Sequence, residues 1–164
     1  MRLRSRHRNQ VKLRRWNVAD AEFCCVARND PALMRWFRQK TPLVVEDQKK
    51  FIEADLETNA YGGYVIETEG IPVGLCAIKS TGEFSIGILP EYQHNGIATK
   101  AMKLLLKKCP HMWSEVFVGN PALEYYISVF GFKITGVKEK AYHKEGVGFV
   151  DVVEIKHDPE FHHK

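Results

Sequence analysis

Apolar residues alternate with polar ones in some segments of the chain and recur every three to four residues in others. Alternation and short apolar runs predict strands at residues 11–16, 64–67, 73–78, 83–89, 113–118, 132–137 and 147–155. Helical spacing predicts helices at residues 20–28, 32–37, 46–59, after Gly96, and at 121–129. The chain therefore mixes helices and strands throughout its length.

This order of elements predicts a mixed α/β fold, with a mainly antiparallel sheet and helices on both faces. The strands that are joined by short turns should be antiparallel. The helix after Gly96 is a crossover, so strands 83–89 and 113–118 should form a parallel pair. Ligands of such sheets bind at the carboxyl ends of strands, beside a crossover helix.

The pattern also makes finer predictions. Asp20 is expected to cap the helix at 20–28, and a polar loop is expected at 138–146. In the helix at 46–59, the residues Phe51, Ile52 and Leu56 share the apolar face that should pack inward.

The turn after strand 83–89 carries the clearest chemical signal. Gln93, Gly96 and Ala98 are spaced as Q-x-x-G-x-A at the start of an amphipathic helix. The first N–H groups of a helix are unpaired, and the positive end of the helix dipole lies behind them. Gly96 lets a ligand approach the backbone closely. The turn therefore predicts a site for a phosphate or pyrophosphate.

Composition narrows the class of protein. A chain of 164 residues with 45% hydrophobic and 27% charged residues is typical of one soluble globular domain. No apolar run is long enough to span a bilayer and no signal peptide precedes the first strand, so we expect a cytoplasmic protein without a membrane partner. The four cysteines lack metal-ligand spacing, which favours buried reduced thiols and no bound metal.

Positive charge gathers at the N-terminus. Residues 1–15 contain seven of the 24 Lys and Arg residues and no acid, while the rest of the chain is slightly acidic. We expect residues 1–10 to be a flexible basic arm, residues 11–156 to form one domain, and residues 157–164 to be a loose tail. A nucleic-acid-binding role for residues 1–15 is the alternative to a merely solvated terminus.

Two motifs together resemble the GNAT superfamily of acetyl-CoA-dependent N-acyltransferases. Gln93 to Ala98 fits the family's phosphate turn, Q/R-x-x-G-x-G/A. Asn120, a short helix and Gly131-Phe132 fit its second block. The stretch from Arg28 to Met34 looks like the ribosomal-protein and sugar-modifying branches, and the resemblance covers residues 11–156.

The resemblance implies acetyl-CoA as co-substrate and assigns its contacts. Backbone N–H groups of the turn would hold the pyrophosphate, and the pantetheine arm would pair with Ile86 to Leu89, which splays from strand 113–118. A backbone N–H near Ile88 or Leu89 would polarise the thioester carbonyl. The implied cofactor-binding residues are Ile88, Leu89, Gln93, His94, Asn95, Gly96, Ile97, Ala98, Thr99 and Asn120.

The resemblance also implies transfer of the acetyl group to a primary amine by direct attack. Glu83 and Ser85 share one face of their strand, and Glu83 is the candidate base, acting through water. The alternative for Glu83 is an exposed strand-end carboxylate. Many relatives carry the acid, a Tyr, where this chain has Ile127. Tyr126 is therefore the candidate acid, or else an aromatic that only packs.

The acceptor side is lined in relatives by the first helices and the last hairpin loop. Here this implies Trp36, Phe37 and Tyr142 as substrate-binding residues, with Arg38 and His143 nearby. Such a lining suits a small-molecule or peptide amine, although Trp36 and Phe37 could instead be core anchors. A coenzyme A-binding module that has lost catalysis is a further alternative, and we expect a monomer or homodimer.

Overall fold

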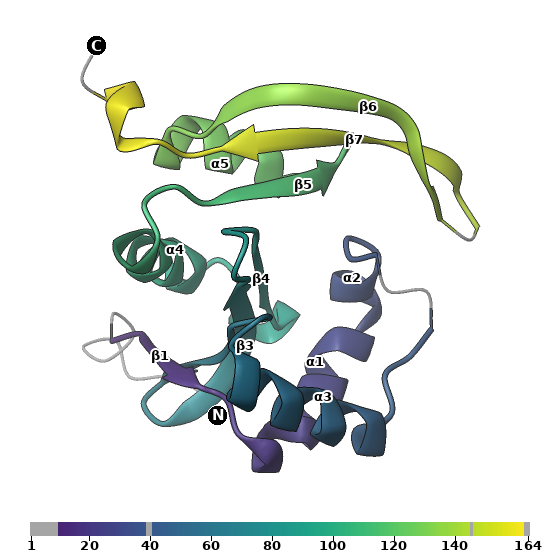
Figure 1. Cartoon of the computed structure of the whole chain (residues 1–164), viewed down its shortest axis with the longest axis vertical. Helices are drawn as coiled ribbons and strands as arrows, with labels where there is room; N and C mark the ends of the chain where they lie inside the picture. The colour runs from purple at the N-terminus through teal and green to yellow at the C-terminus, as the bar shows by residue number, and fades with distance from the viewer. Residues whose placement is uncertain (1–9, 39–40, 145, 163–164) are drawn as a thin grey trace.

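The computed structural model describes residues 10–38, 41–144 and 146–162, so the expected basic arm at residues 1–10 lies almost wholly outside the described residues (Figure 1). Its strands are β1 (Lys12–Arg15), β2 (Gly63–Thr68), β3 (Ile71–Ile78), β4 (Phe84–Ile88), β5 (Trp113–Phe117), β6 (Lys133–Lys144) and β7 (Gly148–Lys156). Its helices are α1 (Ala21–Asn29), α2 (Pro31–Met34), α3 (Val45–Thr58), α4 (Ile97–Lys108) and α5 (Ala122–Phe130). Short 3₁₀ turns lie at Val18–Asp20, Pro90–Tyr92 and Pro159–His162.

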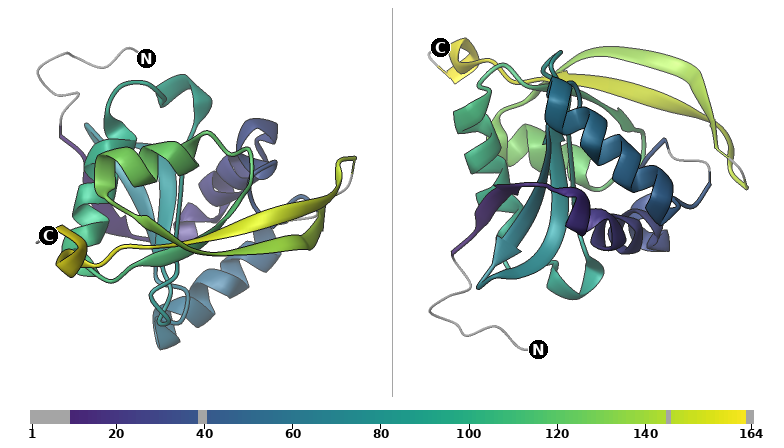
Figure 2. Two further views of the ribbon diagram at one scale, coloured as in Figure 1. Left: turned by 90° about the horizontal axis from the view of Figure 1, so that it is seen from above. Right: turned by 60° about the horizontal axis from the view of Figure 1, so that its bottom comes forward.

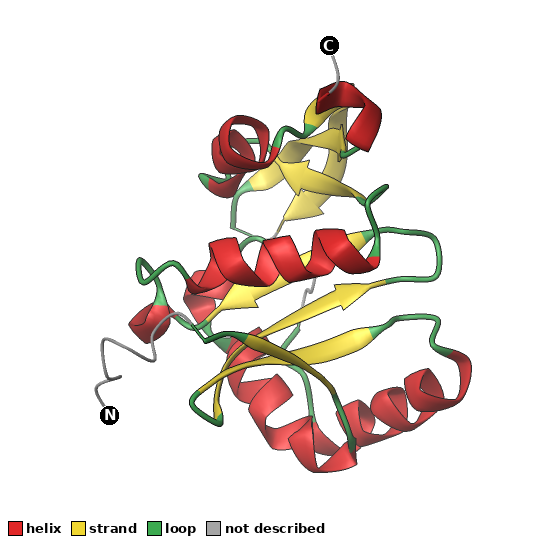
Figure 3. Cartoon of the chain, turned by 90° about the vertical axis from the view of Figure 1, so that its left-hand side faces the viewer, coloured by secondary structure: helices red, strands yellow, loops and turns green. Residues whose placement is uncertain are grey.

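The strands form two antiparallel sheets, and the expected α/β class is confirmed. One sheet has the order β1-β2-β3-β4 and the other β5-β7-β6. Helices cover both sides of the first sheet, because α4 packs on β1 and β4 while α1 packs on β3 (Figures 1 and 3).

The expected parallel pair of β4 and β5 is not confirmed. The two strands belong to different sheets and share one isolated parallel bridge, between Glu83 and Trp113. Beside this bridge the Ser114 hydroxyl donates to the Phe84 carbonyl at 2.9 Å. The Phe84 carbonyl therefore accepts from a side chain of β5 and not from its backbone. Beyond this point β4 and β5 are not paired.

The main core lies between the first sheet, α4, α5 and the second sheet. Its fully or nearly fully buried members include Ile66, Phe84, Met102, Leu105 and Phe132. A second cluster, with Trp16, Cys24, Ile52 and Val65, lies under α1 and α3. Strands β2 and β3 contribute to both clusters, so the first sheet is buried on both of its faces.

Two local expectations are wrong. The Asp20 side chain does not cap α1; it accepts from the Asn17 N–H at 2.8 Å and pairs with Arg14, as part of a capping box on the preceding 3₁₀ turn. In α3, Ile52 is fully buried, but Phe51 and Leu56 are 45% and 40% exposed. Asp55 turns inward instead, because its carboxylate accepts backbone hydrogen bonds from residues 61–63.

The polar loop expected at 138–146 is mostly strand. β6 runs on to Lys144 and pairs with β7 through Tyr142, His143 and Lys144, past an irregularity that begins at Lys138. Backbone hydrogen bonds can hold a hairpin together even where few side chains are apolar. Alternation of apolar and polar residues does not reveal such a hairpin. The hairpin projects from the body of the molecule (Figure 2).

Part of the basic N-terminal segment is used inside the fold. Arg14 pairs with Asp20 and Glu67, and Arg15 pairs with Asp55. Within the described ranges, no helix has both the length and the apolar character to cross a bilayer. Three cysteines, Cys24, Cys25 and Cys76, are buried free thiols.

Candidate active site

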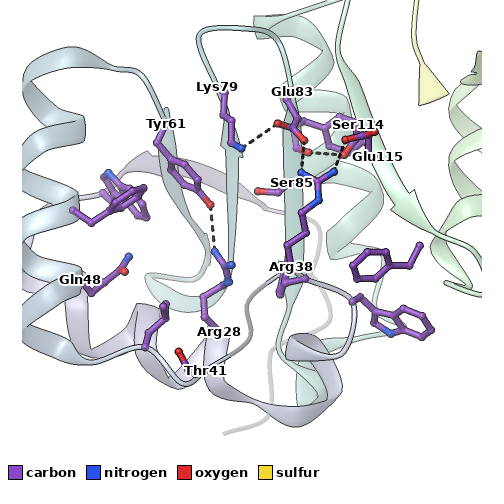
Figure 4. Close-up of a pocket in the computed structure, with 17 residues that line it drawn as sticks. Arg28, Arg38, Thr41, Gln48, Tyr61, Lys79, Glu83, Ser85, Ser114 and Glu115 are labelled. Atoms are coloured by element: carbon purple, nitrogen blue, oxygen red, sulfur yellow. Dashed lines mark hydrogen bonds and ion pairs between the residues drawn. The ribbon is translucent and has the colours of Figure 1, made fainter. Parts of the chain in front are cut away.

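Two cavities flank β4 and meet at its open edge. The first, here the turn cavity, has a volume of ≈ 680 Å³ and lies between β4, the 92–99 turn and α5. The second, here the charged cavity, has a volume of ≈ 480 Å³ and is lined by residues of α1, α3, β4, β5 and the segment after α2 (Figure 4). Both are lined by Trp36, Phe37, Phe84, Ser85, Ser114 and Glu115.

The turn leaves the start of α4 open. Gly96 precedes the helix with a φ of 77°, a left-handed conformation that favours glycine, and no side chain caps the helix. Apart from Gly96 itself and its chain neighbours, no atom lies within 4 Å of where a Cβ on Gly96 would stand. Gly96 and the first residues of the 12-residue helix α4 line the turn cavity, so the uncapped start of the helix lies beside open space, as an anion site requires.

The hydrogen bonding of β4 distinguishes between Ile88 and Leu89, the two residues whose N–H was expected to polarise a thioester. The Leu89 N–H donates to the Val73 carbonyl at 2.9 Å, and the Leu89 side chain is buried. Antiparallel bonds alternate along a strand, so Ile86 and Ile88 direct their N–H groups away from β3. Leu89 is thus excluded as the donor, whereas Ile88 presents its N–H to the gap beside β5.

Most of the expected cofactor residues gather in the turn cavity. Its lining includes Ile88, Gln93, His94, Gly96, Ile97, Ala98, Thr99 and Asn120. Leu89 and Asn95 are outside it, and the Asn95 amide donates to the Tyr92 carbonyl. The Gln93 amide donates to the Ile88 carbonyl at 2.9 Å, which ties the turn to the strand edge. Asn120 accepts from the Ala122 N–H and so fixes the start of α5.

Tyr126 lies in the wall of the turn cavity. Its ring is buried against Phe84 and Phe132, and burial raises the pKa of its hydroxyl far above the ordinary value of 10. Within the described part of the chain this hydroxyl has no hydrogen-bond partner, whereas the Tyr125 hydroxyl bonds Thr99 Oγ1. Tyr126 therefore presents a protonated, available donor.

Glu83 and Ser85 both line the charged cavity. Glu83 pairs with Lys79 (Nζ to Oε1, 3.0 Å) and with Arg38 (Nη1 to Oε2, 3.6 Å). Its side chain is only 16% exposed. Glu83 is therefore more enclosed than the alternative interpretation, an exposed carboxylate at a strand end, would require. Figure 4 shows Arg38 reaching between Glu83 and Glu115.

Glu115 is a second carboxylate that the sequence did not indicate. It lies on β5 and pairs with Arg38 at 2.5 Å and with Lys138 at 2.7 Å. The hydrogen bond from Lys138 lowers the pKa of Glu115 despite the opposing effect of burial, and the nearby Arg38 lowers it further. The available signal was a single charged residue in a strand whose other members are apolar apart from Ser114.

An aromatic group forms another wall of the charged cavity. Trp16 and Tyr61 stack with ring centroids 5.3 Å apart, and Phe51 meets Tyr61 edge-on at 4.9 Å. Asp55 anchors this group by accepting from the Trp16 indole at 2.9 Å and from the Tyr61 N–H at 2.7 Å.

The expected acceptor residues divide into two groups. Trp36 and Phe37 line both cavities, and the Phe37 ring lies against Gly87, where a Cβ would come within 3.2 Å of it. Tyr142 lines neither cavity; its hydroxyl donates to the Arg38 carbonyl and its ring meets Phe117. Tyr142 thus supports the cavity wall.

Arg28 is another residue that sequence reasoning missed. It comes from α1, and its guanidinium lies over the Phe37 ring, 4.3 Å from the centroid. The helical pattern identifies the buried face of α1 by its small apolar residues, among them Cys24 and Ala27. It does not indicate that the charged Arg28 is also directed inward.

Comparisons with known proteins agree with this architecture. The family model described as "Acetyltransferase (GNAT) domain" matches residues 10–133. A spermidine N(1)-acetyltransferase of Escherichia coli is 30% identical over 105 residues, which are 60% of this chain and 56% of the relative. The match thus spans little more than half the length of this curated relative.

Solved structures share the fold at low identity. Spermidine N-acetyltransferase from Vibrio cholerae, solved with CoA and spermine, has a TM-score of 0.80 at 21% identity and covers 90% of this chain and 94% of its own. Ribosomal-protein-alanine N-acetyltransferase from Brucella melitensis has a TM-score of 0.74 at 16% identity and covers 90% and 98%. Because the family model matches most of its length, the chain belongs to the GNAT acetyltransferase family.

Proposed function

We propose that the protein is an N-acetyltransferase that moves the acetyl group of acetyl-CoA directly to a primary amine. The observation that carries this proposal is the meeting of two cavities at the open edge of β4, one with an anion-binding turn and one with carboxylates. Direct attack needs both substrates at one place at once. The shared wall at Ser85 and Glu115 supplies that place.

The residues of the turn cavity fit acetyl-CoA. The open N–H groups after Gly96 would bind the pyrophosphate, and the Ile88 N–H would polarise the thioester carbonyl. Gln93 and Asn120 would fix the turn and the start of α5 around the pantetheine arm. Acetyl-CoA itself supplies the activated acetyl group.

The chemistry assigned to side chains follows from their positions. An amine has a pKa of about 10.4 and must lose a proton before it attacks. Glu83 would receive that proton through water beside Ser85. Tyr126 would donate its proton to the leaving thiolate, since its hydroxyl is protonated and has no other partner among the described residues.

The acceptor is proposed to be a small-molecule or peptide amine. The named relatives act on spermidine, or on the alanine of a ribosomal protein, and all of these present an amine. We further propose that residues 11–156 act as one domain, as monomer or homodimer. The free thiols are consistent with a reducing, cytoplasmic setting.

Thermal shift with acetyl-CoA, followed by thiol release against a panel of amines, tests the proposal. A ligand present at 100 times its Kd stabilises the fold by about 2.7 kcal/mol, which raises the melting temperature by several degrees. No shift with acetyl-CoA at millimolar concentration would overturn the proposal.

A second function is favoured by one specific observation. Ile127 stands where many relatives have their Tyr, and the Tyr126 ring is packed between Phe84 and Phe132. The alternative is a coenzyme A-binding module without catalysis. Stabilisation by acetyl-CoA without thiol release, for any amine of the panel, would support it.

A further inference from the structure

The charged cavity has more cationic than anionic side chains. Its charged lining residues are Arg28, Arg38, Lys79, Glu83 and Glu115. Each carboxylate already has two cationic partners: Arg38 pairs with both, Lys79 with Glu83, and Lys138 with Glu115. Both carboxylates among the described lining residues are therefore already paired with cations, and a ligand would have to compete for them.

Among the described lining residues, Arg28 is the cation without a carboxylate partner. Its Nη1 donates to the Tyr61 hydroxyl at 3.3 Å, and Phe37 covers its guanidinium. Its Nε is buried and has no hydrogen-bond partner, and within the described ranges no carboxylate forms an ion pair with it. Figure 4 shows the Arg28 side chain directed into the cavity, toward Tyr61. A guanidinium that lines a cavity and has no carboxylate partner favours a ligand that supplies an anionic group.

We infer that the acceptor amine carries an anionic group, in the simplest case a carboxylate, that binds Arg28. This inference rests on the proposed acetyltransferase function. Guanidinium and carboxylate form strong charge-assisted hydrogen bonds. The aromatic wall of Trp16, Phe51 and Tyr61 favours an apolar or aromatic body between the anion and the amine. The substrate class is therefore an aromatic or apolar amino acid, or a compound like one.

A polyamine is disfavoured by the same arrangement. Each further ammonium group would lie near Arg28, Arg38 or Lys79, and the carboxylates would have to exchange an existing partner to receive it. Like charges in a partly desolvated cavity repel one another. This chain therefore differs in substrate class from the spermidine acetyltransferases to which it is similar.

Matched amines test the inference through turnover. We expect thiol release to be at least about tenfold more efficient, in kcat/KM, with phenylalanine than with phenylalaninamide, and with 4-(aminomethyl)benzoate than with benzylamine. Spermidine should be the poorest acceptor. Equal efficiency within both matched pairs, or a preference for spermidine, would overturn the inference and leave the acetyltransferase function intact.

A binding measurement decides the matter without turnover. Trp16 and Trp36 line the charged cavity, so their fluorescence should change on titration with 3-phenylpropionate but not with 3-phenylpropanamide. Phenyl phosphate extends the test to a second anion. The absence of any response to either anion would contradict the role of Arg28 even if acetyl-CoA failed to bind. Failure of acetyl-CoA alone would contradict only the proposed function.

Variants separate binding from packing. Arg28→Met keeps an apolar stem against Phe37 and should weaken 3-phenylpropionate binding by about tenfold or more, whereas Arg28→Lys should retain part of it. Lys49→Met removes a charge from the partly exposed Lys49–Glu46 pair on α3 and should change nothing. Melting temperatures and acetyl-CoA shifts are measured alongside. Unchanged anion affinity in a folded Arg28→Met variant would refute the inference.

Discussion

The turn cavity and the charged cavity lie on either side of β4, but they are built from different groups. The turn cavity is formed by backbone N–H groups, small residues and apolar side chains, with His94 and Glu115 as its ionisable lining apart from tyrosines. The charged cavity is formed by side chains that depend on partners far away in the sequence. Backbone groups stay in place when side chains are substituted, whereas a change of side chain can alter which ligand a cavity accepts.

The largest expected effect tests how far the charged cavity depends on one anchor. Asp55→Asn removes the charge that pairs with Arg15 and replaces the oxygen that accepts from the Trp16 indole and the Gly63 N–H with a donor, which should lower the free energy of unfolding by about 3–5 kcal/mol. Denaturant unfolding measures it. Asp47→Asn, on the exposed side of α3, should cost less than about 1 kcal/mol. Equal losses in both variants would mean that Asp55 is not an anchor.

The same anchor gives a pH dependence. Burial alone raises the pKa of Asp55, but hydrogen bonds from Gly63, Arg15, Gly62 and Tyr61 outweigh it, so its pKa lies below the ordinary value. A lowered folded-state pKa contributes stability above the unfolded value of about 3.9, and this stability is lost as the pH falls through the folded value. Acid titration of unfolding should show this loss in the wild type and less of it in Asp55→Asn.

The next effect tests whether the turn cavity also relies on a side chain. Tyr126→Phe should lower the rate of thiol release by about 100-fold while acetyl-CoA still stabilises the protein, because only the donated proton is lost. Tyr125→Phe, which removes the contact with Thr99, should lower it only a few-fold. A normal rate in Tyr126→Phe would leave the tyrosine as a packing residue.

A fourth prediction tests the backbone part of the comparison. Gly96→Val forces a branched side chain into a left-handed conformation and should weaken acetyl-CoA binding by about tenfold, as calorimetry would measure. Gly70→Val has the same backbone strain, with a φ of 75°, in the β2–β3 turn. It should lose similar stability but keep its affinity. If both variants lost affinity alike, general destabilisation would be the cause.

The smallest effect concerns the wall that the cavities share. Gly87→Ala would place a Cβ 3.2 Å from the Phe37 ring, so the ring must shift by a few tenths of an ångström. We expect the KM for the amine and the affinity for acetyl-CoA each to change a few-fold, because Phe37 lines both cavities and Gly87 lines the turn cavity. Gly136→Ala, in β6, meets open space and serves as the control. If neither quantity changed, the Phe37 ring would have shifted without narrowing either cavity.

The sequence predicted those features whose causes are local. The turn at Gln93–Ala98 and the shared face of Glu83 and Ser85 depend on a few consecutive residues, and the structure places both at the cavities. Other features depend on which segments, distant in the sequence, pack together in the fold. These are the two-sheet arrangement, the inward direction of Asp55 and the ion-pair partners of Glu115. Hydrophobic periodicity reports which side chains leave water, not which charges pair, so Arg28 and Glu115 could not be assigned from it.

The ion pairs around Arg38 have a consequence for ionic strength. A line of alternating charges joins the segment after α2 to β5 and β6. Its members are, in order, Lys79, Glu83, Arg38, Glu115 and Lys138. Salt shortens the screening length from about 8 Å under physiological conditions to about 3 Å at 1 M, and partly exposed pairs weaken accordingly. Raising the salt concentration should therefore loosen one wall of the charged cavity and broaden the range of amines that enter it.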